Sequence, residues 1–237
     1  MNTLTKKHWN SKGDKYSKTW DGASRVMLSN REMKLISSIY EKTPGKKILD
    51  MGIGTGRILN HYLATTNSND IYGVDIAESM VDACRRKFSG NKRIRELRVC
   101  DIANEEVPYK FKFDFMSAIR VLKYNVNWDE IIVKSSQLLA EDGIFIFTML
   151  NKNSVNRFWK YDITLHRTTI ADLFQLCNTH NLEIVEIVSV SKLPDLVYGK
   201  SDNVIRNKSV MALEKSLEAL MGKRLLGREY FVAVKRK

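Results

Sequence analysis

The sequence KKILDMGIGTG spans residues 46–56 and joins a short apolar run to three closely spaced glycines. The apolar run is typical of a buried strand, and the pattern RILNHYLATT that follows at 57–66 is typical of a helix. Glycines in such a turn can adopt positive φ and let the backbone approach a ligand closely. The first turn of the helix offers free N–H donors. The stretch therefore predicts a strand, a ligand-binding turn and a helix.

The same alternation continues along the rest of the chain. Strands are expected at 46–51, 70–75, 94–100, 113–121, 143–150, 182–190 and 229–235, and helices at 24–40, 57–66, 78–88, 128–140, 168–181 and 209–221. This order predicts an α/β fold with a doubly wound, mainly parallel seven-stranded sheet and helices on both faces. In such a sheet a ligand binds beyond the carboxyl ends of the strands.

The composition is that of a folded domain. With 237 residues, 43% of them hydrophobic, the chain is long enough to bury a full core, and disorder is excluded. Cys84, Cys100 and Cys177 are far apart and form no CxxC pair, which favours reduced thiols in a cytoplasmic protein over disulfides or a metal site. No apolar run approaches the roughly 20 residues that span a bilayer, so we expect no membrane partner.

The positive charge gathers at the two ends of the chain. Of a net charge of +12, the first 20 residues carry +4 and residues 223–237 carry +5. Basic tails on a soluble protein are the simplest explanation, because no basic and aromatic alternation of a nucleic-acid-binding module accompanies them. The alternative, docking of a structured RNA on the basic termini, predicts binding that weakens steeply with salt.

Three aspartates stand at or next to the ends of successive strands. Asp75 is placed to accept hydrogen bonds from both hydroxyls of a ribose, and Asp101 to accept one from an adenine amino group. Arg57 replaces the third glycine of a dinucleotide fingerprint, which argues against a dinucleotide. Asp50, two residues before the first glycine, is unfavourable beside a pyrophosphate but suits a ligand with an amine and a sulfonium.

These stretches resemble the class I S-adenosylmethionine-dependent methyltransferases. ILDMGIGTG is similar to the first motif of that family, YGVDIAESM to the second and VCDIANEEVP to the third, while FDFMSAIRVLKYN is similar to its fourth strand. The resemblance covers roughly residues 10–150. It implies S-adenosyl-L-methionine as the cofactor, S-adenosyl-L-homocysteine as the product, and no metal. It also implies one methyltransferase domain over 1–237, with an N-terminal cap at 1–45, a cofactor-binding core at 46–150, and an acceptor lid with C-terminal strands at 151–237.

The resemblance also implies roles for individual residues. Three glycines would line the methionine and ribose parts of the cofactor, Asp50 would lie near its amine, and Asp75 would hold the ribose. Apolar neighbours and Asp101 would surround the adenine, and the backbone of Ile119 would meet the amine. An N-terminal segment would close over the cofactor, although its two aromatics could equally be core contacts. The expected cofactor-binding residues are Tyr16, Trp20, Arg25, Asp50, Gly52, Gly54, Gly56, Asp75, Ile76, Met80, Asp101, Ile102 and Ile119.

Methyl transfer from a sulfonium is a direct displacement, so the protein chiefly aligns the reactants and excludes water. A neutral amine needs no dedicated base, whereas a hydroxyl acceptor more often needs one. Tyr16 and His166 are the candidate catalytic residues. The sequence Ala118-Ile119-Arg120-Val121 differs from the Asn/Asp-Pro-Pro-aromatic motif of enzymes that methylate the exocyclic amines of nucleic-acid bases, which argues against that class.

The acceptor lid is expected from residues 1–25, 151–166 and 191–210. Its aromatic and acidic side chains suit an amine-bearing substrate, whereas Arg120 favours an acidic group. Candidate substrate-binding residues are Trp20, Arg120, Tyr124, Trp159, Tyr161, Asp162, Asp195 and Tyr198.

We therefore expect N-methylation of a small natural product or modified peptide, in preference to methylation of a hydroxyl or carboxyl. The peptide N-methyltransferases of the plantazolicin type are the nearest specific resemblance. An RNA methyltransferase and a non-catalytic adenosine-binding scaffold remain as alternatives, and the chain is expected to be a monomer or a homodimer.

Overall fold

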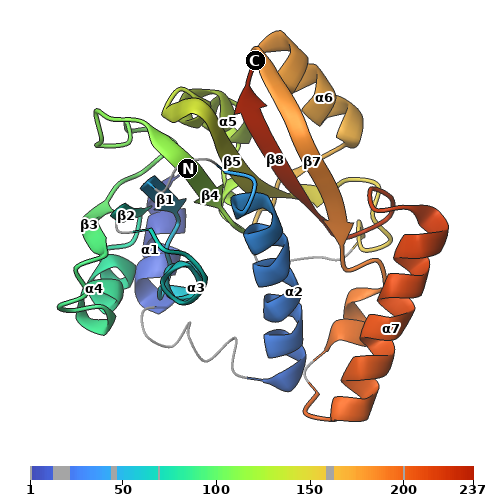
Figure 1. Ribbon diagram of the computed structural model, residues 1–237. Coiled ribbons are helices and arrows are strands. Elements are labelled where there is room, and N and C mark those ends of the chain that lie inside the picture. Colours follow the sequence, from blue (N-terminus) through green and yellow to red (C-terminus); the bar gives the residue numbers. More distant parts are fainter. Residues whose placement is uncertain (1, 13–21, 44–46, 69, 159–162, 200) are drawn as a thin grey trace.

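A single mixed sheet forms the centre of the protein (Figure 1). The computed structural model describes residues 2–12, 22–43, 47–68, 70–158, 163–199 and 201–237. Within them the strand order is β3-β2-β1-β4-β5-β8-β7, and the short β6 pairs with β5. β8 runs antiparallel to both of its neighbours, and the other pairs are parallel. The strands are β1 (Lys47–Met51), β2 (Asp70–Asp75), β3 (Ile94–Val99), β4 (Phe113–Ala118), β5 (Leu139–Asn151), β6 (Arg167–Thr168), β7 (Leu182–Val190) and β8 (Glu229–Arg236).

Helices cover both faces of this sheet. The α-helices are α1 (Asn2–Lys12), α2 (Ala23–Tyr40), α3 (Arg57–Thr65), α4 (Glu78–Lys87), α5 (Trp128–Ser136), α6 (Ile170–Thr179) and α7 (Val204–Met221), and two short 3₁₀ helices are η2 (Leu122–Tyr124) and η3 (Asp195–Tyr198). α2, α3 and α4 pack on one face, and α5 and α6 on the other. α7 stands beside α2 at the periphery (Figure 1).

Strand alternation divides the core into two apolar clusters. Ile48 and Phe115 point to the face covered by α2, α3 and α4, whereas Leu49 and Met116 point to the face covered by α5 and α6. All four side chains are fully buried. Because successive residues of a strand face opposite sides, a strand covered on both faces is a continuous apolar run. This explains why the buried positions of KILDM and FDFMSA are mostly apolar.

The predicted fold class and order of elements are confirmed, and several boundaries differ. The helix expected at 128–140 ends at Ser136, because Leu139 already pairs with Phe113 as the start of β5. The strand expected at 113–121 ends at Ala118, because Arg120 has a φ of 64°, outside the β region.

The structure also contains elements that the sequence did not reveal. The helix expected at 209–221 begins earlier, at Val204, where the side chain of Asn203 accepts a hydrogen bond from the N–H of Arg206. α1, β6 and the two 3₁₀ helices were not predicted. None of the described helices is long and apolar enough to cross a membrane.

Arg93 ties the end of α3 to the start of β3. The three nitrogens of its guanidinium donate hydrogen bonds to the carbonyl oxygens of Leu63, Thr66 and Ser68 at 2.6–2.7 Å. These carbonyls lie at and just beyond the end of the helix, where backbone acceptors lack helical partners.

We predict that Arg93→Met lowers the free energy of unfolding by about 3 kcal/mol, since charged hydrogen bonds to buried carbonyls are lost. Denaturant titration measures this loss of stability. Arg95→Met is the control, because the half-exposed Arg95–Asp70 pair should contribute less than about 1 kcal/mol. Equal losses in the two variants would contradict the role given to Arg93.

Candidate functional site

A pocket opens at the carboxyl edge of the sheet, at the point where the chain order reverses between β1 and β4. Open α/β sheets bind ligands at this place, because the loops on either side of the reversal diverge. The loops after β1, β2, β3 and β4 supply most of the lining. The lining residues are Trp9, Gly52, Ile53, Gly54, Thr55, Arg57, Ile58, Val74, Asp75, Ile76, Met80, Cys100, Asp101, Ile102, Ile119, Arg120, Val121, Tyr124 and Asn125.

The glycine turn after β1 forms one wall of the pocket. Gly52, Gly54 and Gly56 all have positive φ, between 52° and 80°. A Cβ on Gly52 would lie 2.2 Å from Cγ2 of Val121, and a Cβ on Gly56 would lie 2.5 Å from the ring of Phe88. Gly52 and Gly54 line the pocket, whereas Gly56 does not and instead allows α3 to pack closely on α4. The turn thus presents bare backbone to the pocket.

Asp75 connects this turn to the end of β2. Its Oδ2 accepts a hydrogen bond from the N–H of Gly54, and its Oδ1 accepts one from the N–H of Ala77, both at 2.9 Å. Burial raises the pKa of Asp75 above its ordinary value, against the backbone hydrogen bonds that lower it. Each carboxylate oxygen can accept a second hydrogen bond. Asp75 is therefore a pre-oriented acceptor at the pocket wall.

Asp101 and Ile102 follow β3 and line the opposite wall. The carboxylate of Asp101 accepts from the N–H of Ala103 at 3.2 Å and from the side-chain amide of Asn104 at 2.9 Å. These contacts form a local turn that fixes the carboxylate in place. Met80 and Ile102 are buried and line the same pocket. A flat, partly polar group such as a purine fits between such walls.

Asp50 lies beneath the glycine turn and is not among the lining residues. It is fully buried at the end of β1, where its Oδ1 accepts a hydrogen bond from Ser117 at 2.6 Å. Its Oδ2 is also buried and has no hydrogen-bond partner among the described residues. Burial raises the pKa of Asp50 to about 7, although the hydrogen bond from Ser117 and the charge of Arg57 act to lower it. A buried acceptor without a partner favours a water molecule or a ligand donor nearby.

Buried ion pairs organise the pocket floor. Glu32 of α2 pairs with Arg57 at 2.9 Å and with Arg120. Arg120 also approaches Glu229 at 3.6 Å, and Glu229 pairs with Lys123 at 3.1 Å. Arg120 has a positive φ, and its backbone N–H donates a hydrogen bond to Thr148 Oγ1 at 2.7 Å. Both the backbone and the side chain of Arg120 are therefore fixed by polar contacts.

Burial affects the pKa values of both members of the Lys123–Glu229 pair. It lowers the pKa of Lys123 to about 8, against the attraction of Glu229. For Glu229, burial alone would raise the pKa, but the charges of Lys123, Arg120 and Arg228 outweigh it and hold the pKa below its ordinary value. The pair therefore keeps opposite charges at neutral pH.

Trp9 and Tyr124 form an aromatic wall that sequence analysis did not foresee as a pair. Their rings meet edge to face with centroids 5.3 Å apart, and both line the pocket. α1 is held against α4 by Asn10, whose Oδ1 and carbonyl oxygen accept hydrogen bonds from the N–H and hydroxyl of Ser79. Trp9 lies in the segment 1–25, which was expected to close the site. An aromatic residue in that segment was therefore the sequence signal for a pocket-lining residue.

The predicted site residues are only partly brought together. Eight of the thirteen expected cofactor residues line the pocket, namely Gly52, Gly54, Asp75, Ile76, Met80, Asp101, Ile102 and Ile119, and so do Arg120 and Tyr124 of the expected substrate residues. Tyr16, Trp20, Trp159, Tyr161 and Asp162 lie outside the described residues.

Four other predicted residues do not line the pocket. Arg25 lies near Arg120, and its pKa is lowered by burial and by that charge. The N–H of His166 donates to the carbonyl of Lys123 at 2.8 Å, one residue from Tyr124 in the pocket wall. Asp195 pairs with Arg228, and the hydroxyl of buried Tyr198 contacts Glu214 of α7. Their predicted roles stay predictions.

Known methyltransferases are similar to this chain in sequence and in fold. Residues 49–145 match the family model of a methyltransferase domain. Over 152 residues, 60% of the chain, it is 26% identical to a ubiquinone biosynthesis O-methyltransferase of Glaesserella parasuis, and the match covers 64% of that protein. The chain thus spans less than two thirds of the curated relatives it matches.

Solved structures share the fold. A magnesium protoporphyrin IX methyltransferase from Synechocystis with bound SAH superposes with a TM-score of 0.68 at 15% identity, over 100% of both chains. An S-adenosylmethionine-dependent methyltransferase from Clostridium acetobutylicum gives 0.64 at 15% identity, over 94% of this chain and 98% of that one. Residues 49–145 are thus similar to a methyltransferase domain, and the chain shares the fold of solved S-adenosylmethionine-dependent methyltransferases.

We predict that Glu32→Gln lowers the free energy of unfolding by about 3 kcal/mol, because it leaves the partly buried Arg57 and Arg120 without the buried carboxylate that they share. For a chain of this length the Tm should fall by roughly 6–12 °C, measured by calorimetry. Glu41→Gln, at the exposed end of α2, is the control and should leave the Tm within about 1 °C. An unchanged Tm in Glu32→Gln would show that the pairs do not support the pocket floor.

Proposed function

We propose that the chain binds S-adenosyl-L-methionine in this pocket and transfers its methyl group to an acceptor, with S-adenosyl-L-homocysteine as the product. The observation that carries the proposal is the contact between Asp75 and the N–H of Gly54. It joins a bare glycine turn to a carboxylate that can bind the two hydroxyls of a ribose. The match of residues 49–145 to a methyltransferase domain supports the cofactor, as does the fold shared with a methyltransferase that has SAH bound.

The residues of the pocket suit this cofactor. Asp75 would accept hydrogen bonds from the ribose, and Asp101 with Ile102 and Met80 would enclose the adenine. The carbonyl of Ile119 would accept from the cofactor amine, and the unpartnered Oδ2 of Asp50 would act on the same amine through water. The turn at Gly52 and Gly54 has no side chain to exclude the methionine part.

When bound, the cofactor supplies a methyl group on a positively charged sulfur that an electron-rich acceptor displaces. The chain's own residues then align and enclose the reactants. Trp9 and Tyr124 would present aromatic faces to the cationic sulfur and exclude water. Ion pairs hold Arg57 and Arg120 at the floor, where they would fix the orientation of the methionine part and of the acceptor.

We propose an amine of a small natural product or a modified peptide as the acceptor. Among the described lining residues the only carboxylates are Asp75 and Asp101, both placed for the cofactor, and no histidine lines the pocket. A neutral amine attacks without a general base, and an apolar pocket lowers its pKa and so favours the neutral form. The similarity to an O-methyltransferase makes a hydroxyl acceptor the main competitor.

We predict that Asp75→Asn weakens S-adenosyl-L-homocysteine binding at least about tenfold, because one charged acceptor of the ribose is lost. Isothermal titration calorimetry on the folded variant measures it. Asp82→Asn on α4, outside the lining, is the control and should bind like the wild type. Unchanged affinity in Asp75→Asn would place the ribose elsewhere.

We predict that S-adenosylmethionine labelled in its methyl group yields labelled product with amine-bearing peptides and small amines. The panel also contains hydroxy acids, phenols and a structured RNA. Transfer only to hydroxyls would overturn the amine assignment but keep the methyltransferase. Transfer only to RNA, lost on raising the salt, would favour docking through the basic termini. Cofactor binding without transfer to any acceptor class would favour the scaffold alternative.

A further inference from the structure

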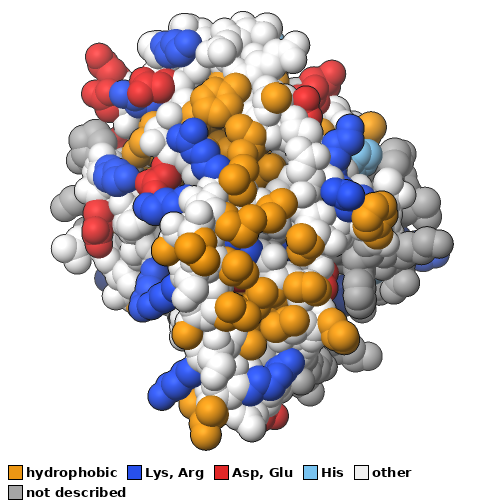
Figure 2. Space-filling view, turned by 90° about the vertical axis from the view of Figure 1, so that its right-hand side faces the viewer, with side chains coloured by type: hydrophobic (Ala, Val, Ile, Leu, Met, Phe, Trp, Pro, Cys, Tyr) orange, Lys and Arg blue, Asp and Glu red, His pale blue; other side chains and the backbone are white. Residues whose placement is uncertain are grey.

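Helix α7 carries several large apolar side chains on its outer side. Ile205, Leu213 and Leu220 are eight and seven residues apart, so they lie on one side of the helix. A helix at the surface of a globular protein normally turns that side to the core. Here the three side chains are 79%, 50% and 83% exposed. Figure 2 shows hydrophobic side chains running as a band down this face of the molecule.

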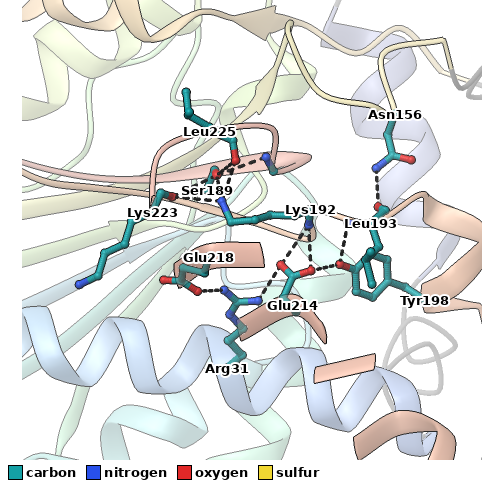
Figure 3. Close-up of polar contacts among 11 residues, drawn as sticks. Arg31, Asn156, Ser189, Lys192, Leu193, Tyr198, Glu214, Glu218, Lys223 and Leu225 are labelled. Atoms are coloured by element: carbon teal, nitrogen blue, oxygen red, sulfur yellow. Dashed lines mark hydrogen bonds and ion pairs between the residues drawn. The ribbon is translucent and has the colours of Figure 1, made fainter. Parts of the chain in front are cut away.

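The opposite side of α7 is acidic and faces the protein. Glu214 is fully buried, and its carboxylate pairs with Arg31 of α2 at 2.7 Å. Arg31 also pairs with Glu218, one helical turn further on, at 2.7 Å (Figure 3). Charged contacts therefore tie α7 to α2.

Further contacts fix the rotation of α7. The Glu214 carboxylate accepts from the N–H of Lys192 at 3.0 Å and contacts the hydroxyl of Tyr198 (Figure 3). Nζ of Lys192 donates to Ser189 Oγ at 2.8 Å and to the carbonyl of Leu225 at 2.7 Å, which holds the loop after α7. Rotating the helix to bury Leu213 and Leu220 would leave these buried charges unpaired, which is strongly unfavourable. The network keeps the apolar band facing outward.

Basic side chains flank the band. Lys208 and Lys215 on α7, and Lys223 and Arg224 in the following loop, are exposed. Both glutamates of the described helix are engaged by Arg31, so α7 presents no exposed carboxylate. Figure 2 shows Lys and Arg side chains on both sides of the hydrophobic band.

The band extends beyond the helix. Leu225 is 53% exposed in the loop after α7. The guanidinium of Arg224 lies 5.9 Å from the ring centroid of Phe174 on α6, whose ring is partly exposed. We call this surface, made of Ile205, Leu213, Leu220, Leu225 and Phe174 with its flanking cations, the α7 face.

We propose that the α7 face docks on the surface of an anionic lipid bilayer, with α7 lying in the plane of the headgroups. An aliphatic stripe bordered by lysines is the pattern of an interfacial helix, and anionic headgroups attract such cations. Protein interfaces are instead enriched in Tyr, Trp and Arg and depleted in Lys. A second copy of this chain would bring two basic faces together. The proposal departs from the sequence-based expectation of no membrane partner, and it concerns the bilayer surface only.

The test is flotation of the full chain with vesicles, at low and at high salt. One set is phosphatidylcholine with about 30% phosphatidylserine, and the other is phosphatidylcholine alone. The test variant is Leu213→Ser with Leu220→Ser. The control is Val126→Ser, which alters a 62% exposed valine next to η2 and outside the α7 face. Circular dichroism and light scattering report folding and oligomeric state.

We expect the wild type and Val126→Ser to bind the anionic vesicles, more weakly at high salt, and the double variant to bind at least about tenfold more weakly while remaining folded. No binding by the wild type, or equal binding to both vesicle types, would overturn the proposal. So would a wild-type dimer that the double variant loses, since the face would then join two copies of the chain. None of these outcomes depends on methyl transfer.

Discussion

The carboxylate of Asp75 is the contact on which the pocket depends. It accepts from the N–H of Gly54 in the turn after β1 and from the N–H of Ala77 in the turn after β2. One buried acceptor thus fixes two loops relative to each other at the edge where the sheet reverses direction. A glycine turn has little conformational preference of its own. The same group that shapes the pocket would therefore hold the ribose, with no rearrangement needed on binding.

Buried charge organises the remainder of this edge. Glu32 reaches from α2 to Arg57 and Arg120 at the pocket floor, and Glu229 at the start of β8 meets Lys123. A further network around Glu214 fixes α7. Buried ion pairs add little net stability but strongly penalise other arrangements. The apolar clusters supply the stability of the sheet, and the charges determine where its loops and outer helices lie.

The sheet was predictable because its signals are local. The run KILDM, the glycines after it and the apolar face of 57–66 each indicate their structure within a few residues. The pocket walls at Asp75 and Asp101 follow from parallel topology, since strand ends meet at one edge. The rest depends on contacts between distant residues. No residue near Arg120 in the sequence indicates its positive φ. The pairing of Glu32 with Arg57 joins two helices, so no local pattern predicts it. The apolar pattern of α7 predicts a buried face, and only Arg31 and Lys192 explain why that face is exposed.

A crystal structure of the chain with S-adenosyl-L-homocysteine would show whether Asp75 holds the ribose. We expect the ribose hydroxyls within about 3 Å of the Asp75 carboxylate, the adenine beside Asp101 and Ile102, and the glycine turn unchanged. An adenosyl group bound elsewhere, or no bound ligand at saturating concentration in crystals whose pocket is open to solvent, would contradict it.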